Sequence, residues 1–594
     1  MRYSERMTKK PWPRLLKADF IFFDALFTAL FLYLWFVIDP RFHFHAQEPV
    51  FFLNSHFIRD SNAVPGGWIE AVAALMLHLF SQPWIGALLL TVTVALICVL
   101  TAAVVRKGSG RSIAILPLIP AVLALPLLSD YQFSPAFFLG LVTALAFVRL
   151  YMALSGVLRL VSFVVLAVFT HIIGAGFTLP FALLTALHEL LQRRPWVAAA
   201  EILFAAVLPW LSASFFYLVT LKHAYLHLLF PSHVTITLLM LLFAPLAILI
   251  GRLIPGRVKL PDIRYSQWIG GIALLLAAAA AAWIIRPGPE RIPLRIDYLA
   301  RYGEWNDVLE TAGQWPAKHA FKSYYVNRAL AHLGRLSDEM FAWPQQAAGD
   351  GLLMADPENP APPLLRSDIY FDLGLINEAH HWAHEALSIK GPTSYILQRL
   401  VLTNLLKNEI NAADKFLAVL AGNPIFKGWA ERYRPLLEGR GTFEKVDPEL
   451  ARLSALNLER DFILNPNLPY QFLDSLITHN SANRMAYDYL MAHYLIKGEL
   501  DRFVVNLGRL NKMGYRALPR HFEEALLIFM IQSKKQSFKL PKNAMNPETL
   551  RRFQRFQQIM TQYRDNHDAG LRVLKKEFAD TYWYYALIHF HLQG

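Results

Sequence analysis

The hydrophobic positions of the chain follow two patterns, one on each side of about residue 286. Before that point, long apolar runs contain few charged residues, whereas from about Leu294 onward apolar residues recur at the spacing of an amphipathic helix. Together the patterns predict an all-α protein, with a polytopic transmembrane helical bundle followed by a soluble α-solenoid in residues 287–594.

Nine apolar runs are long enough to cross a membrane. Because hydrocarbon satisfies no backbone polar group and the core of a bilayer is about 30 Å thick, a crossing helix needs roughly 20 apolar residues. We divide the continuous run from 157 to 191 at Gly174-Ala175-Gly176, where glycine permits a tight reversal. The predicted transmembrane domain, residues 19–286, follows a basic N-terminal segment of residues 1–18 and contains spans at 19–38, 84–105, 112–129, 133–151, 157–173, 175–191, 196–217, 233–251 and 266–285.

The net charge of +13 is unevenly shared, with +10 up to Arg286 and +3 after it. Short loops rich in Lys and Arg stay on the cytoplasmic side of a membrane. With the N-terminus inside, seventeen Lys and Arg residues fall in cytoplasmic segments and only Arg41, Arg59 and Lys222 in outer loops. Nine crossings then place residues 287–594 outside, in the periplasm of a bacterium with this protein in its inner membrane. Because the basic residues flank apolar runs, no nucleic-acid partner is indicated.

Charged residues within the predicted spans lie close to the cytoplasmic ends. Asp24, Arg149 and Glu201 each fall within about six residues of such an end, or about 9 Å along a helix, where a side chain reaches the interface. We find no carboxylate near the middle of a span, which disfavours a proton- or sodium-coupled transporter. The single cysteine, Cys98, excludes a disulfide within the chain.

Five sites in the second half share one pattern. Each begins with Gly or Asn, which adopts the left-handed conformation that ends a helix, and each has Asn, Ser or Asp three residues later to cap the next helix. The five sites start at Gly303, Gly334, Gly374, Asn408 and Gly498, and the predicted caps are Asn306, Ser337, Asn377, Asn411 and Asp501.

The spacing of these sites resembles that of tetratricopeptide repeats. The first four starts are 31, 40 and 34 residues apart, near the 34-residue period of that family. The likeness covers about residues 294–420 and resumes at 485–507 and 523–531, and it is supported by small and aromatic residues at Tyr370, Leu373, Ala379, Ala383 and Ala386. Such solenoids usually bind a protein or peptide, so an envelope partner is expected; a purely structural cap over the membrane domain is the alternative.

The first outer loop, residues 39–66, carries the candidate chemistry. It precedes a stretch at 68–82 that is too short to span comfortably, which we interpret as a helix lying at the membrane interface. A loop over an outer cavity can hold a carboxylate as a base or metal ligand, so Asp39, Glu48 and Asp60 are the candidate catalytic residues; solvated loop carboxylates are the alternative. His223 and His227 are four residues apart, at metal-ligand spacing on a helix, although histidine also suits a membrane interface.

This layout resembles that of membrane-embedded glycosyltransferases that use polyprenyl-phosphate sugars. In that family the first outer loop carries essential acidic residues, often paired, whereas here Asp39, Glu48 and Asp60 are isolated. The resemblance implies a lipid-linked glycan as substrate, with Arg41, Arg59 and Lys222 as contacts for the lipid phosphate.

Three segments resemble an uncharacterised family of Bacteroidetes inner-membrane proteins. They are the loop from Phe51-Phe52 to Pro65-Gly66-Gly67, the Trp84-Ile85-Gly86 sequence, and the Asn483–Met491 segment. That resemblance implies an architecture and a compartment, and supplies no catalytic residue. The sequence therefore leaves two hypotheses: an envelope protein that docks a partner and handles membrane lipid or a lipid-linked glycan as a glycosyltransferase, and a non-catalytic scaffold for envelope protein assembly.

Overall fold

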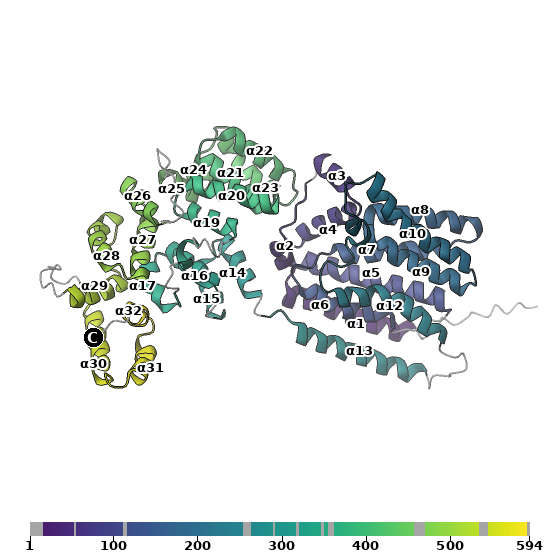
Figure 1. The fold of residues 1–594 in the computed structure, drawn as a ribbon, viewed down its shortest axis with the longest axis horizontal. Coiled ribbons are helices and arrows are strands. Elements are labelled where there is room, and N and C mark those ends of the chain that lie inside the picture. Colours follow the sequence, from purple (N-terminus) through teal and green to yellow (C-terminus); the bar gives the residue numbers. More distant parts are fainter. Residues whose placement is uncertain are drawn as a thin grey trace, which may run out of the picture. The chain divides into compact units, whose positions relative to one another are not determined.

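The computed structural model describes residues 16–52, 55–110, 116–253, 263–288, 291–316, 320–345, 350–354, 362–456, 470–533 and 545–590. Within these ranges every regular element is a helix, so the all-α prediction is confirmed there. The chain divides into two compact units, Met1–Gly288 and Pro289–Gly594 (Figure 1).

Among the described residues of the first unit, six helical stretches are long and apolar enough to cross a membrane: Ile21–Ile38, Pro83–Ser109, Gly156–Leu191, Pro195–Phe215, Val234–Leu253 and Trp268–Ile285. They coincide with seven of the predicted spans, because Gly156–Leu191 contains two of them. The predicted spans at 112–129 and 133–151 correspond to shorter apolar helices, Leu116–Ser129 and Ala136–Tyr151; residues 112–115 lie outside the described ranges. The chain is therefore a multi-pass membrane protein.

The helices of this unit pack around one apolar core contributed by nearly all of them. Their other faces leave large apolar side chains exposed, as expected for surfaces that meet lipid. In chain order the helices are α1 (Leu16–Tyr33), η1 (Leu34–Ile38), α2 (Arg41–Gln47), α3 (Ser55–Asn62), α4 (Gly67–Leu79), α5 (Pro83–Ser109), η2 (Leu116–Leu118), α6 (Ile119–Ser129), α7 (Ala136–Tyr151), α8 (Gly156–Gly174), η3 (Ala175–Phe177), α9 (Thr178–Leu191), α10 (Pro195–Phe215), α11 (Leu221–Leu226), α12 (Val234–Leu253) and α13 (Ile263–Ile285).

The long run at 157–191 reverses at the predicted glycines. Helix α8 ends at Gly174, Ala175 adopts a left-handed φ of +46°, and α9 runs back after the short η3 turn. Arg159 near the start of α8 then lies 3.0 Å from Glu189 near the end of α9. A Cβ at Gly176 would lie 2.7 Å from the carbonyl oxygen of Tyr225, so only glycine fits in this turn.

The predicted interfacial stretch at 68–82 is helix α4. The amide of Gly66, at its N-terminal end, donates to the carbonyl of Ile172 near the end of α8. Ile69 and Ala73 of α4 form a small core with Ala136 at the start of α7. Helix α4 therefore packs against the C-terminal end of α8 and the N-terminal end of α7.

The second unit is a succession of short helices, many of them in antiparallel pairs (Figure 1). Its helices are α14 (Arg291–Arg301), α15 (Trp305–Gly313), α16 (Ala320–His332), α17 (Leu336–Glu339), η4 (Met340–Ala342), α18 (Asp350–Leu353), α19 (Pro363–Asp372), α20 (Ile376–Lys390), α21 (Ser394–Leu406), α22 (Ile410–Ala421), α23 (Lys427–Leu437), α24 (Phe443–Val446), α25 (Pro448–Leu456), α26 (Gln471–His479), α27 (Arg484–Lys497), α28 (Leu500–Asn506), η5 (Leu507–Met513), α29 (Arg520–Ser533), α30 (Pro547–Gln562), α31 (His567–Phe578) and α32 (Tyr582–Phe590).

The five predicted helix-ending residues all adopt the left-handed conformation, which confirms that part of the repeat pattern. Their φ angles lie between +60° and +83°. At each turn the next residue donates its amide to the carbonyl five positions earlier, at 2.7–3.0 Å, as from Glu304 to Leu299 and from Leu375 to Tyr370. This bond defines the Schellman motif, so one backbone turn joins all five helix pairs.

The predicted caps of the following helices are wrong. Each next helix starts two residues after the left-handed residue, so Asn306, Ser337, Asn377, Asn411 and Asp501 each occupy the second helical position. The cap position itself holds Glu304, Arg335, Leu375, Glu409 or Glu499, without a capping side-chain hydrogen bond. The physical reason is the Schellman bond, which uses the amide immediately after the turn, so each helix restarts two residues sooner than predicted.

A buried ionic network joins the first helices of three successive pairs. Arg328 of α16 donates to Asp372 of α19 at 2.5 Å, and Arg399 of α21 donates to Asp368 of α19 at 2.7 Å. Arg328 also reaches Asp368 at 3.3 Å, so the two arginines and two aspartates form one connected set. Burial alone raises the pKa of Asp372, but Arg328 and His332 hold that pKa well below its usual range, so Asp372 stays ionised.

Candidate functional site

Asp39 and Arg41 form an ion pair with each other. Arg41 donates to Asp39 through Nη2 at 2.7 Å and through Nε at 3.0 Å. Asp39 is buried at the junction of η1 and α2 and has a left-handed φ of +59°. The structure thus brings together one predicted catalytic carboxylate and one predicted phosphate contact, and each neutralises the charge of the other.

The other predicted loop residues lie on separate elements. Glu48 follows the last residue of α2 in the left-handed conformation, with a φ of +42°. Asp60 and Arg59 are exposed on α3, and Lys222 is exposed on α11. Their catalytic and lipid-binding roles remain predictions.

His223 and His227 are adjacent in space, as their spacing suggested. Their rings stack with centroids 4.0 Å apart, although α11 ends at Leu226 and His227 is its C-cap. His227 Nε2 lies 3.0 Å from Oε1 of Glu70 on α4. Across the described ranges, no group of three or more His, Cys, Asp or Glu side chains is arranged to hold a metal ion, and metal binding by the histidine pair remains a prediction.

A deeply buried polar cluster of the first unit lies elsewhere, and it was not predicted from the sequence. Tyr151 Oη at the end of α7 lies 2.6 Å from Oε1 of Glu201 on α10 and 3.0 Å from Oε1 of Glu189 on α9. Arg159 Nη1 of α8 donates to the same Glu189 oxygen at 3.0 Å. Four consecutive helices therefore each contribute one polar group to a shared site.

The side chains of this cluster are buried, whereas charged residues at the ends of helices are usually exposed to solvent. Tyr151 and Glu189 are fully buried and Glu201 is 3% exposed. The expectation that Glu201 reaches the interface is wrong, because its side chain points into the bundle toward Tyr151. One sequence signal was available: Glu189 and Glu201 flank the short Arg193-Arg194-Pro195 connection, so the antiparallel helices that it joins bring them to the same level.

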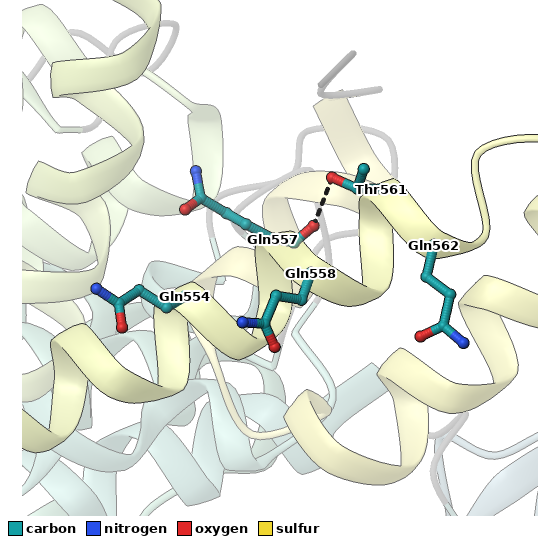
Figure 2. Close-up of a pocket in the computed structure, with 5 residues that line it drawn as sticks. All are labelled: Gln554, Gln557, Gln558, Thr561 and Gln562. Atoms are coloured by element: carbon teal, nitrogen blue, oxygen red, sulfur yellow. Dashed lines mark hydrogen bonds between the residues drawn. The ribbon is translucent and has the colours of Figure 1, made fainter.

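Polar side chains line hollows in the described part of the second unit, and two of these bear on function. One, of about 240 Å³, contains Arg520, Glu524 and Arg552, whose charges pair with one another or with Asp580, and Glu523, which accepts hydrogen bonds from the Asn546 amide and the Thr549 hydroxyl. The other, of about 550 Å³, is an open hollow along α30, lined by Gln554, Gln557, Gln558, Thr561 and Gln562, which we call the glutamine face (Figure 2). Its side chains are exposed and uncharged, while Phe553, Phe556 and Ile559 bury the other side of α30.

The chain belongs to DUF6057, described as a family of unknown function, which it matches over residues 14–589. No curated protein and no solved structure matches the chain. The family assignment agrees with the expected membership of a family without an established activity. The likeness to polyprenyl-phosphate-dependent glycosyltransferases remains a prediction.

Proposed function

We propose that this DUF6057 protein is a bacterial inner-membrane protein whose second unit lies in the periplasm and docks a polypeptide partner of the envelope. The observation that carries the proposal is the repeated helix pair, with five turns of one backbone design. Stacked helix pairs present extended surfaces, and the repeat families built this way, tetratricopeptide repeats among them, characteristically bind protein or peptide.

The proposed orientation of the chain in the membrane is supported by the helix ends that lie together at one end of the bundle. Arg159, Glu189 and Glu201 link the start of α8, the end of α9 and the start of α10, and Arg252 of α12 donates to the Gly108 carbonyl near the end of α5 at 2.9 Å. These are the ends assigned to the cytoplasm by their excess of Lys and Arg. A cytoplasmic N-terminus and a periplasmic second unit agree both with the contacts between these helix ends and with their excess of Lys and Arg.

The glutamine face is the docking surface that we propose. Each glutamine amide offers two donor hydrogens and one acceptor oxygen without a charge, which suits the peptide groups and polar side chains of another polypeptide. An uncharged face selects its partner by hydrogen-bond geometry more than by long-range attraction. This role requires no catalysis, and it includes the scaffold hypothesis for envelope protein assembly.

Site-specific photo-crosslinking in living cells tests the docking surface. A photoreactive residue at Gln557 or Gln558 is expected to give one discrete product of higher mass, with a polypeptide in it. The matched control is Glu385, an exposed residue of α20 away from the glutamine face, which is expected to give no such product. Equal crosslinking from all three positions, or none from the glutamines, contradicts the proposal.

A second candidate function is the handling of a lipid-linked glycan, and the backbone strain in the first unit favours it. Asp39, Glu48, Ala175, Leu228 and His233 all hold left-handed φ angles, between +42° and +69°. Such strain in residues other than glycine is common at binding and catalytic sites. Replacing Asp39, Glu48 and Asp60 with alanine, one at a time, and comparing envelope glycans by mass spectrometry tests it; unchanged glycans in all three variants contradict it.

A further inference from the structure

The buried cluster of Tyr151, Glu189 and Glu201 contains more acceptors than protons. The Tyr151 hydroxyl carries one hydrogen and lies within hydrogen-bond distance of a carboxylate oxygen on each side, at 2.6 Å and 3.0 Å. An ionised carboxylate can only accept a hydrogen bond. Both contacts are therefore hydrogen bonds only if one of the two glutamates is protonated and donates to the tyrosine oxygen.

The cations around the cluster identify which glutamate is ionised. Oε1 of Glu189 accepts from Arg159 at 3.0 Å, and Oε2 of Glu189 lies 3.7 Å from Nη1 of Arg194. Glu201 makes no ion pair with a residue of the described ranges. Glu189 is therefore the anion that balances Arg159, and the extra proton belongs on Glu201.

The second oxygens of the two glutamates point to the same assignment. Both Oε2 atoms are buried without a hydrogen bond in the described part of the chain, but that of Glu189 lies 3.7 Å from Arg194, whereas Glu201 forms no ion pair there. An unsatisfied oxygen is much more costly on a charged carboxylate than on a neutral carboxyl, because the charged group loses more hydration on burial. A protonated Glu201 leaves only the carbonyl oxygen of a neutral acid without a partner.

We propose that the membrane unit binds one proton at neutral pH in the chain Glu201–Tyr151–Glu189, with the proton on Glu201 and the negative charge on Glu189. Glu201 donates to Tyr151, Tyr151 donates to Glu189, and Arg159 fixes the charge at the far end. The titratable and charged groups around this chain are Arg159 of α8, His188 of α9 and Arg194 before α10, with Lys107 of α5 and Arg252 of α12 farther out. The ligand of this site is therefore a proton, shared by two carboxyl groups that the Tyr151 hydroxyl connects.

Infrared spectroscopy of the full-length protein in nanodiscs tests the site directly, since a protonated carboxyl and a carboxylate absorb at different frequencies. At pH 7 we expect a carboxyl band that shifts in deuterated buffer, is lost in Glu201→Gln and persists in Glu70→Gln, a control at an exposed glutamate. Tyr151→Phe is expected to keep the band but shift it, because the carboxyl loses its acceptor. Absence of the band from the wild type, its survival in Glu201→Gln, or an unmoved band in Tyr151→Phe overturns the proposal.

Thermal unfolding of the same samples separates the two glutamates. Glutamine is close in shape to a neutral glutamic acid, so Glu201→Gln is expected to leave the melting temperature within about 2 °C of the wild type. Glu189→Gln leaves Arg159 without its anion and is expected to lower the melting temperature by at least about 5 °C. Equal effects of the two variants contradict the assignment of the proton to Glu201.

Discussion

At the scale of single residues, the fold stabilises different ionisation states of two buried aspartates in the second unit. Asp372 is held ionised by two cations, whereas Asp488 of α27 is 3% exposed and its partners are the hydroxyls of Ser337 and Tyr515 and, at 3.8 Å, Arg484. Burial raises the pKa of Asp488 to about 6, because the hydroxyls and Arg484 only partly offset the lost hydration. Relative to the unfolded chain, the fold therefore favours the protonated form of Asp488.

This difference predicts a pH dependence for Asp488→Asn. The folded state holds the Asp488 proton more tightly than the unfolded state does, so the stability from this group is complete below about pH 4 and is lost as the pH rises through about 6. Between pH 4 and pH 7 the wild type is expected to lose up to about 3 kcal/mol relative to Asp488→Asn. Amide hydrogen exchange of α27 in the full-length protein measures it, and parallel pH profiles for the two proteins contradict it.

At the scale of elements, the five Schellman turns join the paired helices of the second unit. Gly334 has a φ of +67°, and a Cβ there would meet nothing closer than Arg484 Nη2 at 4.0 Å. Gly334→Ala therefore adds backbone strain with almost no clash, and it is expected to destabilise the α16–α17 pair by about 1–2 kcal/mol. Gly313→Ala, also in open space but without a left-handed φ, is the matched control; equal effects on hydrogen exchange contradict the argument.

Elements were predicted better than the contacts between them. Glycine spacing and apolar run length are local properties, so they gave the five turns and the reversal at Gly174–Gly176. The cap positions were wrong because two motifs compete for the same few residues, and the Schellman bond determined where the next helix starts. The cluster of Tyr151, Arg159, Glu189 and Glu201 was missed because it depends on how four helices pack together. The sequence of any one span does not show that packing.

At the scale of the whole molecule, the predicted topology is open to chemical labelling. Cys98 is buried in α5, so an introduced cysteine is expected to provide the accessible thiol of the protein. Glu385→Cys, away from the glutamine face, is expected to react with a membrane-impermeant maleimide in cells with a permeabilised outer membrane, whereas Arg193→Cys reacts only after the inner membrane is opened. The reverse pattern contradicts the orientation.

The ionic network of Arg328, Asp368, Asp372 and Arg399 has a mechanical consequence. If each helix pair were held only by its own contacts, a pulling force applied to the ends of the unit would open the pairs one after another. Here buried ion pairs connect three successive helix pairs. Unfolding one of these pairs alone would leave a charge of another pair buried without its partner. Stretched in an optical trap, these three pairs should rupture together in one long extension step, and the remaining pairs in shorter ones.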